Sequence, residues 1–117
     1  MLNFEKLDVW QKSIAFADFV YTETQRFPVE ERFGLTNQMR RDAVSISSNI
    51  AEGSSHTSRQ DYRRFVEIAT GSTFEVVSQA RIAHHQGWLA EASHQLLYDD
   101  ALTIVRMLSG LRSSLDS

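Results

Sequence analysis

Three histidines and a glutamate near one predicted turn are the residues best able to hold a metal ion. His84 and His85 shortly precede Gly87, and Glu91 and His94 follow it. Imidazole nitrogens and a carboxylate form a ligand set that suits zinc. Adjacent helical residues point about 100° apart, so His84 and His85 cannot both face one ion. A two-metal carboxylate site needs two Glu-x-x-His pairs, and only Glu91–His94 has that spacing. These residues are therefore interpreted as polar side chains near a solvated turn, and no metal or cofactor is predicted.

Catalysis is not indicated by the remaining polar residues. Ser45, Ser47 and Ser48 lie close to Asn49 and Glu52, but this segment contains no histidine that could act as a base. The chain has no G-x-S-x-G motif and no glycine-rich phosphate loop. The serines and Asn49 are interpreted as making hydrogen bonds between helices or forming a polar outer face. No catalytic residue is predicted, and the protein is expected not to be an enzyme.

A group of arginines, here called the arginine patch, is the main candidate for binding. Residues 26–64 contain seven arginines and five acidic residues, although the whole chain has a net charge of −3. Arginine suits bidentate contacts with phosphate or carboxylate groups. One interpretation is a salt-bridged surface with neighbouring acidic side chains as partners. The other is a nucleic-acid-binding surface. The patch consists of Arg40, Arg41, Arg59, Arg63 and Arg64.

Length and composition indicate one globular domain over residues 1–117. The chain is 42% hydrophobic and 23% charged and contains no cysteine, which excludes disulfides and thiolate metal sites. Its first ten residues lack the apolar core of a signal peptide. No segment approaches the roughly 18 apolar residues of a membrane span. A cytoplasmic protein without a membrane partner is expected.

The elements that must position these residues are four helices. Apolar and small residues from Tyr62 to Ala83 recur at alternating spacings of 4 and 3 residues, and a similar stripe runs from Leu97 to Leu115. Such stripes require packing against other helices. Gly53 and Gly87 are expected to end helices, and Gly71 in mid-helix suggests a close approach of another backbone. The predicted fold is all-α, an antiparallel up-down-up-down four-helix bundle with helices at about 8–27, 36–53, 58–86 and 90–114.

The first predicted helix carries apolar residues on more than one stripe. That is wider than a surface helix of a monomer requires. We therefore expect one of its faces to contact another subunit. The predicted interface residues are Phe16, Phe19 and Val20.

Several segments of the sequence are similar to those of a known bacterial family. They are Val9-Trp10-Gln11, Asn37 to Arg41, Val44-Ser45-Ile46, Asn49 to Gly53, Ile68-Ala69, Gly71-Ser72 and Glu75. The chain resembles the four helix bundle protein family, whose members are often encoded in intervening sequences of bacterial 23S ribosomal RNA genes. This family is related to the accessory variability determinants of diversity-generating retroelements.

The resemblance implies an antiparallel four-helix bundle that assembles into a ring-like homopentamer. For the retroelement relatives it implies a basic surface that engages nucleic acid and a reverse transcriptase. This chain departs from that pattern because it is acidic overall. Ser47 also stands where proline is common in the family, and Thr70 where a basic residue is common.

Two hypotheses follow for function. The first is a non-enzymatic oligomeric interaction protein that binds RNA or a nucleoprotein through the arginine patch. The second is a structural or scaffolding oligomer whose partners are proteins only. A salt series separates them, because affinity that depends on phosphate contacts falls as salt rises.

Overall fold

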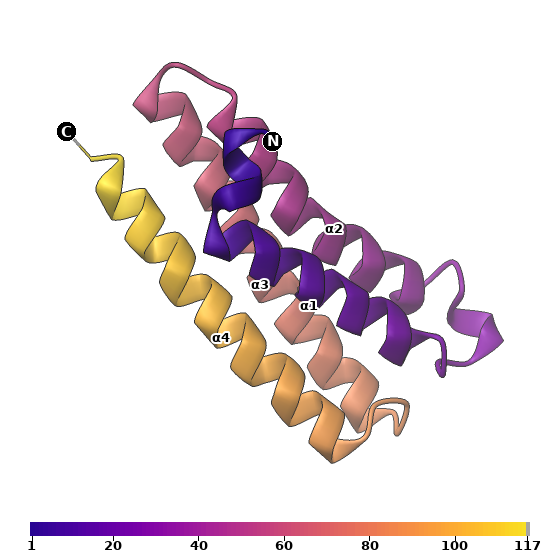
Figure 1. Cartoon of the computed structure of the whole chain (residues 1–117). Coiled ribbons are helices and arrows are strands. Elements are labelled where there is room, and N and C mark those ends of the chain that lie inside the picture. Colours follow the sequence, from indigo (N-terminus) through magenta and orange to yellow (C-terminus); the bar gives the residue numbers. More distant parts are fainter. Residues whose placement is uncertain (117) are drawn as a thin grey trace.

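A computed structural model describes residues 1–116 of the chain, and these residues contain helices but no strand. The four predicted helices are all present (Figure 1). Two short 3-10 helices, η1 and η2, lie before α1 and between α1 and α2. The bounds are η1 Asn3–Lys6, α1 Asp8–Thr24, η2 Val29–Glu31, α2 Leu35–Ser54, α3 Arg59–His85 and α4 Glu91–Ser114.

The helices form one elongated bundle that measures 45 × 23 × 23 Å. In Figure 1, each helix runs opposite to the one before it along the chain, as short connections require. The ends of α2 and α4 and the beginnings of α1 and α3 therefore share one end of the bundle. The turn between α3 and α4 lies at the other end.

The core is formed by the stripes that the spacing predicted. On α3, every member of the stripe from Val66 to Ala83 is buried, and on α4 the buried members run from Leu97 to Leu108. The side chains with almost no exposed area include Phe16, Met39, Ile46, Ile50, Val66, Val76, Ile104 and Leu108. This contiguous apolar interior confirms the prediction of a helical bundle.

Two helix ends show how local sequence sets the boundaries. Ser58 is the N-cap of α3, and its hydroxyl accepts a hydrogen bond from the Asp61 N–H at 3.3 Å. Gly53 was expected to end the second helix, but α2 continues through it to Ser54. Gly53 is buried against α3, so its role is close packing between helices rather than capping.

The residues of the predicted interface on α1 are largely buried in the single chain. Phe16 is 1% exposed and Val20 is fully buried, and both belong to the core of the same chain. They therefore expose almost no surface to another subunit in this arrangement, and a contact of α1 with another subunit stays a prediction. Phe19 is half-buried against this core. The broad apolar surface of α1 is explained mainly by its contacts with α2 and α4 within the chain.

No helix among the described residues combines the length and apolar character that crossing a membrane requires.

Candidate functional site

The turn between α3 and α4 brings the predicted metal-ligating residues together. Gly87 has a φ of +82°, a conformation that glycine adopts without a Cβ clash. The Trp88 N–H donates to the carbonyl oxygen of Ala83 at 2.9 Å, and the Gly87 N–H donates to that of His84 at 3.0 Å. This hydrogen-bond pattern is a Schellman motif. It reverses the chain, so the last turn of α3 faces the first turn of α4.

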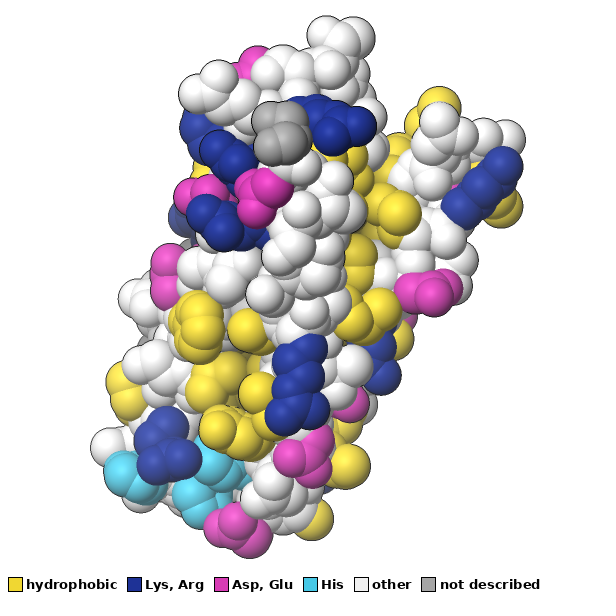
Figure 2. Space-filling view, turned by 90° about the vertical axis from the view of Figure 1, so that its left-hand side faces the viewer, with side chains coloured by type: hydrophobic (Ala, Val, Ile, Leu, Met, Phe, Trp, Pro, Cys, Tyr) yellow, Lys and Arg dark blue, Asp and Glu magenta, His cyan; other side chains and the backbone are white. Residues whose placement is uncertain are grey.

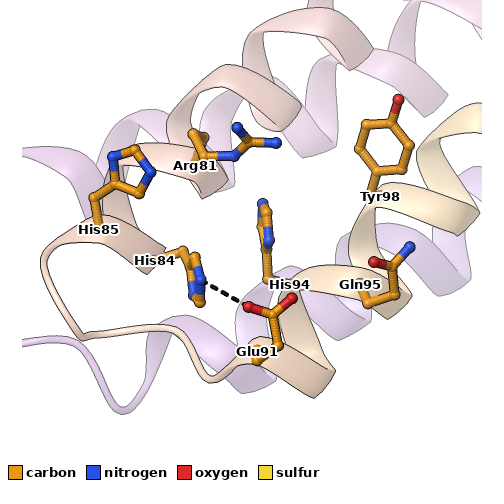
Figure 3. Close-up of a pocket in the computed structure, with 7 residues that line it drawn as sticks. All are labelled: Arg81, His84, His85, Glu91, His94, Gln95 and Tyr98. Carbon is orange, nitrogen blue, oxygen red and sulfur yellow. Dashed lines mark ion pairs between the residues drawn. The ribbon is translucent and has the colours of Figure 1, made fainter.

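His84, Glu91 and His94 converge at this turn (Figure 3). One possible ligand atom from each of the three residues lies within 4.8 Å of the other two. The His84 and His94 rings are stacked, with centroids 4.7 Å apart and planes inclined by 5°. Glu91 and His94 lie three residues apart on α4 and therefore share one face of that helix. Two elements of the fold thus build a cluster with two imidazoles and one carboxylate.

His84 is held by oxygen atoms at both ring nitrogens. Its Nδ1 lies 2.9 Å from the carbonyl oxygen of Leu89, and its Nε2 lies 2.9 Å from Oε2 of Glu91. Since a carbonyl oxygen can only accept, the Nδ1 of His84 is the donor in the first contact. A neutral imidazole has one N–H, so both contacts are hydrogen bonds only when the ring is protonated. The Nε2 position can alternatively face a cation shared with Glu91.

His94 is the buried member of the cluster, with 8% of its surface exposed. Burial lowers the pKa of His94, and the charges of His84 and Arg81 lower this pKa further, whereas Glu91 raises it. The neutral ring, which carries a nitrogen lone pair, is therefore favoured. Arg81, His85, Gln95 and Tyr98 line the rest of the pocket.

The sequence identified these residues but not their convergence. Figure 3 places His85 on the opposite side of His84 from Glu91, in agreement with the expected divergence of adjacent histidines. The cluster depends instead on His84 meeting α4 across the turn. The informative signals were Gly87 and the three-residue spacing from Glu91 to His94. The prediction that no metal binds stays a prediction.

The arginine patch is not continuous in the structure. Arg40 and Arg41 lie in the first half of α2, whereas Arg59, Arg63 and Arg64 lie in the first turns of α3. Gly53, beside the start of α3, follows Arg41 by twelve residues, which corresponds to about 18 Å along a helix. The two groups of arginines therefore occupy separate positions along the bundle.

Three of these arginines have contacts within the chain, and one of them is Arg64, whose guanidinium lies 4.8 Å from the Phe65 ring centroid. The Arg40 Nε donates to the Thr24 hydroxyl at 2.9 Å, and its guanidinium lies 4.7 Å from the Tyr21 ring centroid. Arg63 pairs with Asp116 at 2.6 Å. Among residues 1–116, the exposed Arg41, Arg59 and Arg64 form no salt bridge. These three arginines can still offer N–H groups to an anionic partner, because a contact with an aromatic ring leaves the positive charge of Arg64 unpaired.

A polar layer joins α2 to α3. The Ser45 and Ser72 hydroxyls lie 2.9 Å apart and form a hydrogen bond between the two helices, which is one of the two arrangements considered for the polar residues of this segment. Gln79 Nε2 donates to Asp42 Oδ2 at 2.7 Å. A hydrogen bond with Asp42 and the charge of that carboxylate raise the pKa of Glu75. These hydrogen bonds link α2 to α3 at more than one position along the helices.

An exposed apolar surface lies along α3 and α4. Phe74 is 59% exposed, Tyr98 is 42% exposed and Leu102 is 38% exposed. Figure 2 shows hydrophobic side chains gathered on this side of the molecule, next to the histidines. A shallow groove runs among them. We call this surface the α3–α4 apolar face, and it comprises Phe74, Val77, Tyr98, Ala101, Leu102 and Val105.

Comparison with known proteins supports the predicted resemblance. Residues 5–110 match the family described as 23S rRNA-intervening sequence protein. The chain belongs to this family. A crystal structure of a protein with unknown function from the S23 ribosomal protein family of Bacteroides thetaiotaomicron VPI-5482 is similar, with a TM-score of 0.80. That similarity covers 89% of this chain and 97% of the other at 21% identity, so it concerns the fold. No curated protein matches the chain.

Proposed function

We propose that this member of the 23S rRNA-intervening sequence protein family is a non-enzymatic interaction protein that assembles with copies of itself. The observation that carries this proposal is the α3–α4 apolar face. Phe74, Tyr98 and Leu102 are large side chains, and each exposes more than a third of its surface in the single chain. Contiguous exposed apolar surface of this kind is typical of protein interfaces.

A second copy of the chain is the favoured occupant of the α3–α4 apolar face. The resemblance to the four helix bundle family implies a ring-like homopentamer, in which each subunit contacts its two neighbours through two different surfaces, and the α3–α4 apolar face would be one of these. Phe74 and Tyr98 are aromatic side chains, the residue class enriched at the centres of interfaces. Association would remove both from water. Phe74, Tyr98 and Leu102 offer more exposed surface for such a contact than the buried Phe16 and Val20, which supports the α3–α4 apolar face as the interface.

The substitution Phe74→Glu tests this assignment. A carboxylate at the centre of an apolar interface is costly to desolvate, so the variant should sediment as a smaller species than the wild type. Folding should be retained because Phe74 is 59% exposed. Ile68→Glu is the matched control, since Ile68 is an exposed α3 residue outside the α3–α4 apolar face. Equal sedimentation coefficients for Phe74→Glu and the wild type would reject this interface.

RNA binding is a second candidate function. The exposed Arg41, Arg59 and Arg64 favour it because they are free of salt bridges within residues 1–116. A symmetric oligomer would repeat these arginines on every subunit and so increase the number of phosphate contacts. The net charge of −3 per chain opposes RNA binding, and an oligomer would also multiply this negative charge by the number of its subunits.

Replacement of Arg41, Arg59 and Arg64 by alanine should weaken binding to structured RNA by about tenfold or more at low salt. The wild-type affinity should itself fall as salt rises, because phosphate contacts release counterions. Filter binding over a salt series measures both effects, and Arg26→Ala with Arg32→Ala serves as a charge control. Affinity that is independent of salt and of the three arginines would exclude RNA recognition by this surface.

A further inference from the structure

We propose that His84, Glu91 and His94 form a binding site for a divalent transition-metal ion, with Zn²⁺ as the best-suited ion. The donor set contains two imidazole nitrogens and one carboxylate oxygen, which is a ligand set found at zinc sites that keep a fourth position open. This proposal is independent of the proposed self-association, because none of the three residues belongs to the α3–α4 apolar face.

The first support is the proximity of the ligand atoms. The three candidate atoms lie within 4.8 Å of one another. In a tetrahedral zinc site with bonds of about 2.0–2.2 Å, ligand atoms are roughly 3.3 Å apart. To bring the ligand atoms from their present separation to that of a zinc site, the stacked rings of His84 and His94 have to turn toward a common point. The Glu91 side chain is 75% exposed and can follow them. Rotation of these three side chains would bring their ligand atoms closer to one point.

The second support is the contact that orients His84. Metal-binding histidines commonly donate their second ring N–H to a carbonyl or carboxylate oxygen, which fixes the ring. His84 has this arrangement, because its Nδ1 donates to the Leu89 carbonyl at 2.9 Å. The Nε2 of His84 is thereby directed at the Glu91 carboxylate, 2.9 Å away. Turning the ring about this hydrogen bond leaves Nε2 available to an ion that lies between the two residues.

The third support is the rigidity of the elements that carry the ligands. Glu91 and His94 share one face of the first turns of α4, and His84 lies in the last turn of α3. The Schellman motif at Gly87 fixes the connection between these elements. The backbone positions of the three residues are thus fixed before an ion binds, so that only their side chains have to be ordered.

The charges around the site act in both directions. Arg81 lines the same pocket, and its positive charge opposes a bound cation. Glu91 supplies the negative charge that offsets it. Gln95 and Tyr98 line the remaining side, where a water molecule or a further ligand could complete the coordination.

Calorimetric titration of Zn²⁺ into the chelator-treated full chain without a histidine tag tests the proposal. The expected result is one ion per chain, accompanied by a higher melting temperature. The variants Glu91→Gln and His94→Ala should each weaken binding by about tenfold or more. Glu91→Gln is the more decisive variant, because its exposed side chain can be changed without disturbing the core.

Two other histidines provide controls in the same chain. His85 lines the same pocket but lies apart from Glu91 in Figure 3, and His56 precedes α3 near the opposite end of the bundle. His85→Ala and His56→Ala should bind Zn²⁺ as the wild type does. In ring-nitrogen NMR spectra, Zn²⁺ should shift His84 and His94 but not His56. Absence of binding to the wild type, or equal losses in Glu91→Gln and His56→Ala, would overturn the site.

Discussion

Phe16→Glu is expected to unfold the protein. Phe16 is 1% exposed and packs into the core of the bundle. Truncating a buried phenylalanine to alanine costs about 3–5 kcal/mol, and the glutamate carboxylate adds the penalty of leaving water. Since domains of this size are stable by only about 5–15 kcal/mol, most of the folding free energy is lost. Far-UV circular dichroism and urea titration measure the effect.

Ile14→Glu is the matched control for this prediction. Ile14 lies on the same helix but is 37% exposed, so a glutamate at this position stays in contact with water. The urea midpoint of Ile14→Glu should remain near the wild-type value. A helical Phe16→Glu variant with an unchanged midpoint would contradict the placement of Phe16 in the core.

Gly53→Ala should destabilise the fold by about 1–3 kcal/mol, although alanine is the better helix former. A Cβ added at Gly53 would lie 2.9 Å from the Phe65 Cβ, 3.0 Å from Tyr62 Cδ1 and 3.3 Å from the Tyr62 carbonyl oxygen. Because backbone and Cβ atoms cannot rotate away, α2 and α3 would have to separate. Urea denaturation monitored by circular dichroism measures the loss.

Gly71→Ala is the control, and its effect on the stability of the fold should be opposite to that of Gly53→Ala. Gly71 is exposed in the middle of α3, and a Cβ added there would meet no atom within 4 Å. The close backbone approach that its position suggested is therefore not found within the described chain. Alanine should stabilise α3 by up to about 1 kcal/mol. Destabilisation by Gly71→Ala together with no effect of Gly53→Ala would contradict the packing of α2 on α3.

The sequence predicted the helices well because their apolar spacing reflects the period of the α-helix. The ends were less predictable. The first helix stops at Thr24 rather than at residue 27, since Gln25 to Phe27 form a turn before Pro28. Gly53 also shows why helix ends are hard to predict, because a glycine that permits close packing of two helices looks the same in the sequence as one that ends a helix. Distinguishing the two requires knowledge of the neighbouring helix.

Residue roles that depend on contacts between helices could not be read from the sequence. Apolar spacing indicated that α1 is broadly hydrophobic, but it could not tell the core residue Phe16 from the exposed Ile14. Sequence position placed Arg40 and Arg63 in one patch, although each contacts a partner within the chain. His84 meets Glu91 only because of the geometry of the turn at Gly87.

Sedimentation equilibrium of the wild-type chain over a wide concentration range tests self-association most directly. The proposed assembly predicts a mass several times the 13.4 kDa of one chain, decreasing toward that value on dilution. A mass of 13.4 kDa at every concentration would contradict it.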